Sequence, residues 1–200
     1  MRGIFVLLWA SLMLPISASS QITCEREIDG PGKEVPGPPA PIFELPKPFE
    51  RPAALPSHVL ALLRTDEQNA DKFDACRSRE NLAEIPAKWF VATEIKMAND
   101  ELPGLLVKAA DSCLWSKMDR QDVGEFWLFR QAPTGYQLMF SATTEAFQLL
   151  HTHTGGYPDL CTSWGEFGEF FQDIYTFQEG KYLPYLHSSL TMDFFQAPPK

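Results

Sequence analysis

The stretch from Phe147 to Tyr185 constrains the fold of this chain more than any other part of the sequence. It reads FQLLHTHTGGYPDLCTSWGEFGEFFQDIYTFQEGKYLPY, so short runs rich in Phe, Tyr, Thr and Trp alternate with glycine-containing breaks. Gly155-Gly156 and Glu179-Gly180 mark hairpin turns, because tight hairpins need the positive φ angles that glycine adopts. About four antiparallel strands are therefore expected in this stretch.

Strand patterns also occur before this stretch. Residues 90–97 (FVATEIKM) alternate in polarity, and a mostly apolar run follows at 104–110. Residues 125–130 (EFWLFR) form a continuous apolar run, which is typical of a central strand buried on both faces. After a turn at Pro133-Thr134-Gly135, residues 136–141 predict one more strand. Together with the later hairpins, these runs predict about eight strands.

Residues 57–77 predict one broken helix or two short helices. Ser57 is a suitable N-cap for a helix with Val59, Leu62 and Leu63 on one face. Thr65 and Gln68 have the spacing of a capping box, which indicates a restart. The sequence therefore predicts a mainly β (α+β) fold: an antiparallel meander sheet, a small sandwich or a partial propeller-like domain, with an N-terminal helical segment.

The N-terminal sequence indicates export. Arg2, an apolar run at 4–14 and the small residues Ala18-Ser19-Ser20 predict a signal peptide at residues 1–20. Residues 21–56 contain recurrent prolines and are interpreted as a proline-rich linker or a clamp on the domain surface. One β-rich domain is expected at 57–190, followed by a tail at 191–200. The protein is therefore expected to be secreted or periplasmic.

The four cysteines all follow the expected cleavage site, in an oxidising compartment. They allow three pairings, and we favour Cys76 with Cys113 because Cys24 lies beyond the proline-rich stretch. A bacterial lipid anchor on Cys24 is not expected, because Gln-Ile-Thr precedes it where a small residue would be required. The chain contains no CxxC motif, so neither a zinc ribbon nor a thioredoxin-like site is indicated.

The charge balance excludes two classes of partner. The chain has 26 acidic and 17 basic residues, a formal net charge of −9, and no cluster of Lys and Arg. It therefore lacks the electrostatic footprint of a protein that binds nucleic acid or an anionic membrane surface. After the signal peptide no apolar stretch approaches the length that a transmembrane helix requires.

Two short units share the order apolar residue, proline, small or acidic residue, leucine: LPGLLV (102–107) and YPDLCT (157–162). With GYPDL (156–160) and FQEGKY (177–182), they resemble the strand-turn-strand units of FG-GAP or VCBS-type repeats and a group of exported bacterial proteins of unknown function. The resemblance covers about residues 88–185 and implies a meander of strands. The calcium ligands of that family are not matched, since the second loop has only Asp159, and no cofactor is expected.

His151 and His153 are the candidate metal ligands. Residues two apart on a strand share a face, and two imidazoles can hold a transition metal if a third ligand is present. With an even number of residues in the following loop, the histidines share a face with Trp164, opposite to Asp159 and Cys161. We therefore expect the histidines at the rim of an apolar core face and no metal site.

Glu166 and Glu169 are the candidate catalytic carboxylates. Their spacing in GEFGEF (165–170) is compatible with the carboxylate pair of glycoside hydrolysis. The simpler interpretation is a pair of outward-facing residues at a strand end or bulge. The Gly-x-Ser-x-Gly elbow of serine hydrolases is absent. We therefore expect no enzyme, and keep as an alternative a secreted hydrolase that uses Glu166 and Glu169 or a histidine-centred metal.

Aromatic residues near the C-terminus provide the functional hypothesis. Phe170 and Phe171 cannot both point inward on a regular half-exposed strand, so part of this set should reach the surface. The candidate binding residues are Trp164, Phe167, Phe170, Tyr157 and Asp159. An aromatic patch rimmed by carboxylates suits a protein or a glycan. The expected function is an exported, non-enzymatic binding module of the cell envelope, with a periplasmic inhibitor of a lytic enzyme as a third possibility.

Overall fold

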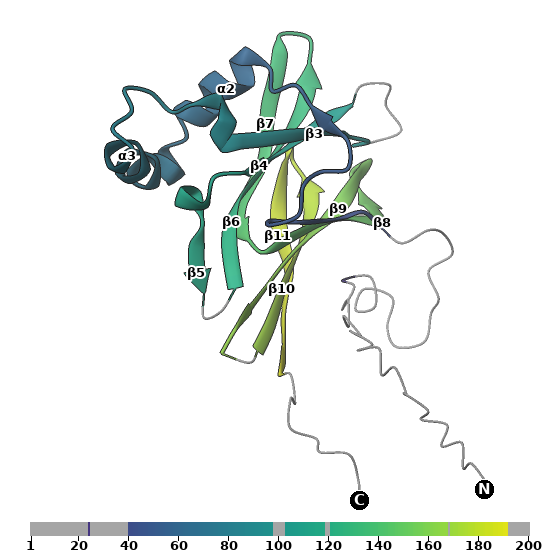
Figure 1. The fold of residues 1–200 in the computed structure, drawn as a ribbon. Coiled ribbons are helices and arrows are strands. Elements are labelled where there is room, and N and C mark those ends of the chain that lie inside the picture. The colour runs from purple at the N-terminus through teal and green to yellow at the C-terminus, as the bar shows by residue number, and fades with distance from the viewer. Residues whose placement is uncertain (1–23, 25–39, 98–102, 119–120, 168, 192–200) are drawn as a thin grey trace, which may run out of the picture.

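The structure is a computed structural model that describes residues 24, 40–97, 103–118, 121–167 and 169–191 (Figure 1). The expected signal peptide at 1–20, the loop around Asn99, Asp100 and Glu101, and most of the expected tail lie outside the described residues. No helix in the described part of the chain is long and apolar enough to cross a lipid bilayer.

Two antiparallel sheets form the domain, as the mainly β prediction requires (Figure 1). Sheet A has the order β1 (Ile42–Glu44), β8 (Ala146–Thr154), β9 (Tyr157–Glu166), β10 (Glu169–Gln178) and β11 (Lys181–Thr191). Sheet B has the order β2 (Pro52–Ala53), β3 (Phe90–Ile95), β4 (Gly104–Ala109), β6 (Gln121–Ala132), with β5 (Ser116–Met118) and β7 (Gly135–Thr144) both paired to β6. The strands expected from the sequence are all present, and β1, β2 and β5 are additional.

The helices cover the outer face of sheet B (Figure 1). They are α2 (Ser57–Arg64), α3 (Ala70–Arg79) and the short 3-10 turns η1 (Glu67–Asn69), η2 (Ala87–Trp89) and η3 (Ser112–Leu114). The domain therefore has three layers: helices, sheet B and sheet A. Strand β6 lies in the middle layer, so it is apolar on both faces, as its continuous apolar run predicts. Phe126 and Leu128 lie in the core between the sheets. Trp127 and Phe129 lie in the core under the helices.

The helical segment is broken as expected, but its caps differ from the prediction. The N-cap position of α2 is Pro56, without a side-chain cap, where Ser57 was expected. At the restart Asp66 is the cap, because its carboxylate accepts a hydrogen bond from the backbone N–H of Gln68. The Asp66 carboxylate also accepts a hydrogen bond from Trp127 Nε1 at 2.7 Å. This tertiary contact favours Asp66 over the local capping box of Thr65.

The folded domain begins before residue 57. Residues 42–44 and 52–53, which were expected in the linker at 21–56, are strands of the two sheets. Strand β1 pairs with β8 and β2 pairs with β3. Leu45 and Phe49, between these strands, are buried in the core between the sheets. Prolines are compatible with this arrangement because β1 and β2 are edge strands, on which a missing N–H costs no ladder hydrogen bond.

Two disulfides connect distant parts of the chain. Cys76–Cys113, the pairing favoured from the sequence, joins α3 to η3 across 37 residues. Cys24–Cys161 spans 137 residues and attaches Cys24 to the outer face of sheet A, where both residues pack with Leu150 and Ile174. The second bridge was left open by the sequence. It engages the Cys24 thiol that a lipid anchor would need.

Candidate functional site

Three neighbouring rings lie on β9, β10 and β11, and two of the three ring pairs are stacked, the third being tilted at 39°. Trp164 and Phe171 are directly opposite one another, with ring centroids 5.6 Å apart and an interplanar angle of 17°. The His187 ring lies 6.1 Å from Phe171 at 23° and 6.4 Å from Trp164. Trp164 and Phe171 are half-buried and His187 is exposed. We call these three residues the aromatic platform.

The strand register places carboxylates on the same face as the platform. Opposite residues in an antiparallel pair share a face, as do alternate residues along one strand. The pairs on this face are Glu166 with Glu169, Trp164 with Phe171, and Asp173 with His187. Further along β9 and β10 the same face enters the core between the sheets, where Leu160 and Phe177 are buried. The platform therefore lies where sheet A continues beyond the cover of sheet B.

Asp173 fixes the edge of the platform. Its Oδ1 lies 2.5 Å from Nδ1 of His187, and its Oδ2 accepts a hydrogen bond from the Tyr175 hydroxyl at 3.4 Å. Burial raises the pKa of Tyr175, and the neighbouring charge of Asp173 raises it further. Tyr175 therefore remains a neutral donor at physiological pH, and Asp173 holds the His187 ring in line with Phe171. No local sequence pattern indicates His187 or Asp173 as site residues, because the strand register alone brings them together.

The β9–β10 hairpin presents a single aromatic residue beyond the platform. Phe167 lies in the turn with φ +50° and is 82% exposed. Glu166 and Glu169 flank the turn and face one another, which agrees with their expected position at a strand end. Directly opposite residues place their Cβ atoms about 4.5–5.5 Å apart. The tip therefore carries two neighbouring carboxylates and one exposed ring.

Gly165 attaches this hairpin to sheet B. Its backbone N–H donates a hydrogen bond to Oε1 of Gln121 on β6, at 2.7 Å. A Cβ atom at this position would lie 2.5 Å from the same oxygen, which is closer than real contacts allow. Glycine at this position therefore permits the approach of Gln121, which connects the β9–β10 hairpin to β6.

The other predicted binding residues lie elsewhere. Phe170 is on the opposite face from the neighbouring Phe171, since it pairs with Gly165. Tyr157 lies at the far end of β9, about 23 Å from Trp164 along the strand. There its ring packs on that of Phe177, with the ring centroids 4.2 Å apart. Asp159 is 5% exposed, on the outer face of sheet A. Of the five residues, the structure brings together only Trp164 and Phe167.

The two candidate metal ligands lie on the last part of β8. The loop is the even-numbered Gly155-Gly156, and His153 pairs with Pro158, as the expected register requires. Both histidines are exposed and line a pocket of about 400 Å³, and His153 Nδ1 donates a hydrogen bond to the carbonyl of His151 at 2.8 Å. No group of three or more His, Cys, Asp or Glu suited to a metal occurs within the described ranges.

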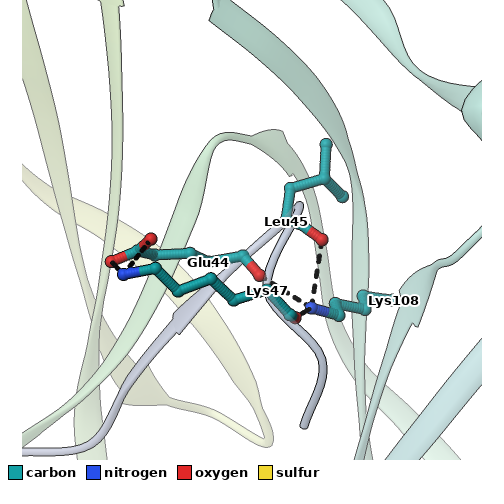
Figure 2. Close-up of polar contacts among 4 residues, drawn as sticks. All are labelled: Glu44, Leu45, Lys47 and Lys108. Atoms are coloured by element: carbon teal, nitrogen blue, oxygen red, sulfur yellow. Dashed lines mark hydrogen bonds and ion pairs between the residues drawn. The ribbon is translucent and has the colours of Figure 1, made fainter.

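Lys108 is a buried lysine bonded to backbone carbonyls, and the sequence interpretation did not single it out. Figure 2 shows its Nζ donating to the backbone carbonyls of Glu44 at 2.7 Å, of Leu45 at 3.1 Å, and of Lys47. The ammonium also lies 4.7 Å from the centroid of the Phe49 ring. A lone lysine within the apolar run GLLVKA was the available signal, because buried lysines need partners.

The surroundings of Lys108 indicate a structural role. Its side chain lines a pocket of about 490 Å³ formed by β1, residues 47–51, β3 and β4. Burial lowers the pKa of Lys108 to about 8, against the opposing influence of Glu44. The three acceptors use all three N–H groups of the ammonium, which leaves no donor for a ligand. Lys108 therefore fastens residues 44–49 to sheet B.

Comparisons with known proteins give no match to a family model, to a curated protein or to a solved structure.

Proposed function

We propose that this protein is an exported, non-enzymatic binding module of the cell envelope that holds a glycan on the aromatic platform. The observation that carries the proposal is a set of near-parallel rings open to solvent and flanked by carboxylates on one sheet face. Ring faces suit the C–H surfaces of sugar rings, and carboxylate oxygens accept hydrogen bonds from hydroxyl groups. The two disulfides and the N-terminal signal pattern support export.

The proposal is tested by calorimetric titration of the full mature chain with neutral hexasaccharides, cellohexaose and chitohexaose. We expect saturable binding of at least one of them and a loss of affinity of about tenfold or more in Phe171→Ala, because central aromatic contacts dominate binding energy. Phe170→Ala is the matched control, since it removes the same ring from the adjacent position on the opposite face. Absence of binding, or an equal loss in both variants, would contradict the proposal.

A hydrolase is a second candidate because Glu166 and Glu169 face one another across the hairpin. Retaining glycosidases hold their two carboxyl groups about 5–5.5 Å apart, close to the spacing of opposite strand residues. Their general acid is usually desolvated, whereas Glu169 is exposed and Glu166 is half-buried. Hydrolysis ranks lower for this reason. Release of reducing ends from the same hexasaccharides, abolished in Glu166→Gln and in Glu169→Gln, would place it first.

An inhibitor of a lytic enzyme is favoured by one observation, the 82% exposed Phe167 at the hairpin tip. A single aromatic anchor on a tight turn suits insertion into the cleft of a partner. Inhibition of a lysozyme that is lost in Phe167→Ala but retained in Phe171→Ala would support this role. The opposite pattern would assign any effect to the platform.

A further inference from the structure

A separate apolar pocket opens on the outer face of sheet B, where α2 and η1 meet β6 and β7. Its volume is about 330 Å³. Trp127 and Phe129 form its floor and are each 1% exposed. Leu62 and Leu138 line its mouth and are each 42% exposed. Two large apolar side chains therefore face solvent on either side of one cavity, where a ligand could cover both.

The charges at the mouth are of one sign. Among the residues that the structure describes, Asp66 and Glu67 are the charged ones that line the pocket. Arg64, the nearest basic residue in the sequence, is engaged elsewhere, since its guanidinium donates to the carbonyl of Ile85 and pairs with Glu84. An apolar cavity with an acidic mouth is complementary to a positively charged ligand that has an apolar part.

The position of the Asp66 carboxylate is fixed by three donors. It accepts hydrogen bonds from the backbone N–H of Gln68 at 3.1 Å, from Asn69 Nδ2 at 3.0 Å and from Trp127 Nε1 at 2.7 Å. The last of these bonds connects the acidic mouth to the aromatic floor. Ser141 on β7 donates to Oε1 of Gln68 at 3.2 Å, which ties the η1 side of the pocket to the sheet. The pocket is thus built from side chains with defined positions.

We propose that this pocket binds a small organic cation. The apolar body of the ligand fills the space between Leu62 and Leu138, and its positive charge lies beside Asp66 and Glu67. The volume is at the lower end of the range of about 300–1,000 Å³ for ligand pockets, which suits one aromatic ring with a short charged chain. The site is independent of the aromatic platform, so either can fail without the other.

Methyl NMR of the full chain, labelled at leucine, tests the charge preference. The probes are phenethylammonium and phenylacetate, which have a similar apolar body and opposite charge. We expect phenethylammonium to produce saturable shifts at the methyl groups of Leu62 and Leu138, and phenylacetate to bind at least about tenfold more weakly. Equal binding of both probes, or shifts that do not saturate, would overturn the proposal.

Two substitutions of the same kind test the location. Leu138→Lys places a positive charge at the mouth and should abolish phenethylammonium binding. Leu186→Lys is the matched control, because Leu186 lies on β11 and is 40% exposed, almost as much as Leu138. Retained binding in Leu138→Lys, or loss in both variants, would overturn the proposal. If Leu138→Lys does not fold, Glu67→Gln gives the same test, with a loss of about threefold expected and no change contradicting the site.

Discussion

Two aromatic clusters of similar composition have opposite relations to solvent. Phe73, Phe90 and Trp127 form a buried cluster between the helices and sheet B, and each of the three is at most 4% exposed. The aromatic platform of Trp164, Phe171 and His187 lies on sheet A and is half-buried or exposed. Helices cover the first cluster, whereas sheet B does not extend over the second. Cover by distant elements therefore decides which rings can serve a ligand.

The ring geometry of the clusters also differs. In the buried cluster Phe90 meets Phe73 at 83° and Trp127 at 73°, the edge-to-face arrangement common in cores, and the third pair, Phe73 with Trp127, is stacked at 29°. In the platform the rings lie within 23° of parallel for Trp164 with Phe171 and for Phe171 with His187. Stacked rings cover one another's facing sides, so the ring edges and the outer face of an end ring are the surfaces that a ligand can use. The difference supports structural stabilisation by one cluster and binding by the other.

Removal of the disulfides gives the largest expected effect. Cys24–Cys161 is attached to β9, the strand that also carries Trp164, whereas Cys76–Cys113 lies beside the buried cluster. The chain-entropy model assigns about 5 kcal/mol to a bridge that closes 137 residues and about 4 kcal/mol to one that closes 37. Urea unfolding of Cys24→Ser/Cys161→Ser and Cys76→Ser/Cys113→Ser measures both. A smaller loss for the first pair would show that local packing outweighs loop length.

Substitution of one tryptophan in each cluster tests the comparison directly. Trp127→Ala should lower the free energy of unfolding by about 3–5 kcal/mol, because it opens a core cavity. Trp164→Ala should lower it by about 1 kcal/mol or less and instead abolish glycan binding. Chemical denaturation and calorimetric titration of both variants separate the effects. Similar stability losses would indicate that the platform is a structural cluster.

Substitution of Lys108 tests how much a buried charge between the sheets contributes to the free energy of unfolding. Lys108→Met should cost about 3 kcal/mol near pH 7, because it leaves buried carbonyls without a donor. The folded pKa of about 8 lies below the ordinary 10.5, so the unfolded chain binds more protons between these values. The stability of the wild type relative to Lys108→Met should therefore rise with pH above 8.

Urea unfolding between about pH 7.5 and 9.5 measures this slope. Measurements stay below pH 10 because burial raises the pKa of Tyr175 and Tyr182 and introduces an opposite trend above that point. A difference between the two proteins that is constant with pH would contradict the lowered pKa of Lys108.

Glu125 gives the smallest expected effect, next to the buried cluster. Burial raises its pKa, while a hydrogen bond from the Thr143 hydroxyl at 2.6 Å opposes this shift. With a raised folded pKa, the contribution of Glu125 to stability falls as pH rises above 4.5. Glu125→Gln should therefore gain stability relative to the wild type between pH 4.5 and 7. Urea unfolding of both proteins at these two pH values measures the change. A loss of stability of Glu125→Gln relative to the wild type over this interval would contradict the raised pKa of Glu125.

The elements whose signals are local could be predicted from the amino-acid sequence. Gly155-Gly156 and Glu179-Gly180 specified the β8–β9 and β10–β11 turns, and the even loop Gly155-Gly156 set the register that places His153 opposite Pro158. The run EFWLFR indicated a strand buried on both faces, which β6 is. The break in the helical segment was also predictable. These features depend on turn geometry and on side-chain periodicity over a few residues.

Which residues share a surface depends on strand pairing and on packing between distant elements. His187 and Asp173 join Trp164 and Phe171 through strand pairing, and Phe170 leaves them because adjacent strand residues alternate between faces. Residues 40–53 belong to the domain because distant strands pair with them and Lys108 holds their carbonyls. Such contacts depend on residues far apart in the chain, so no local pattern encodes them. The candidate site therefore arises from packing, whereas the strands that build it follow from the sequence.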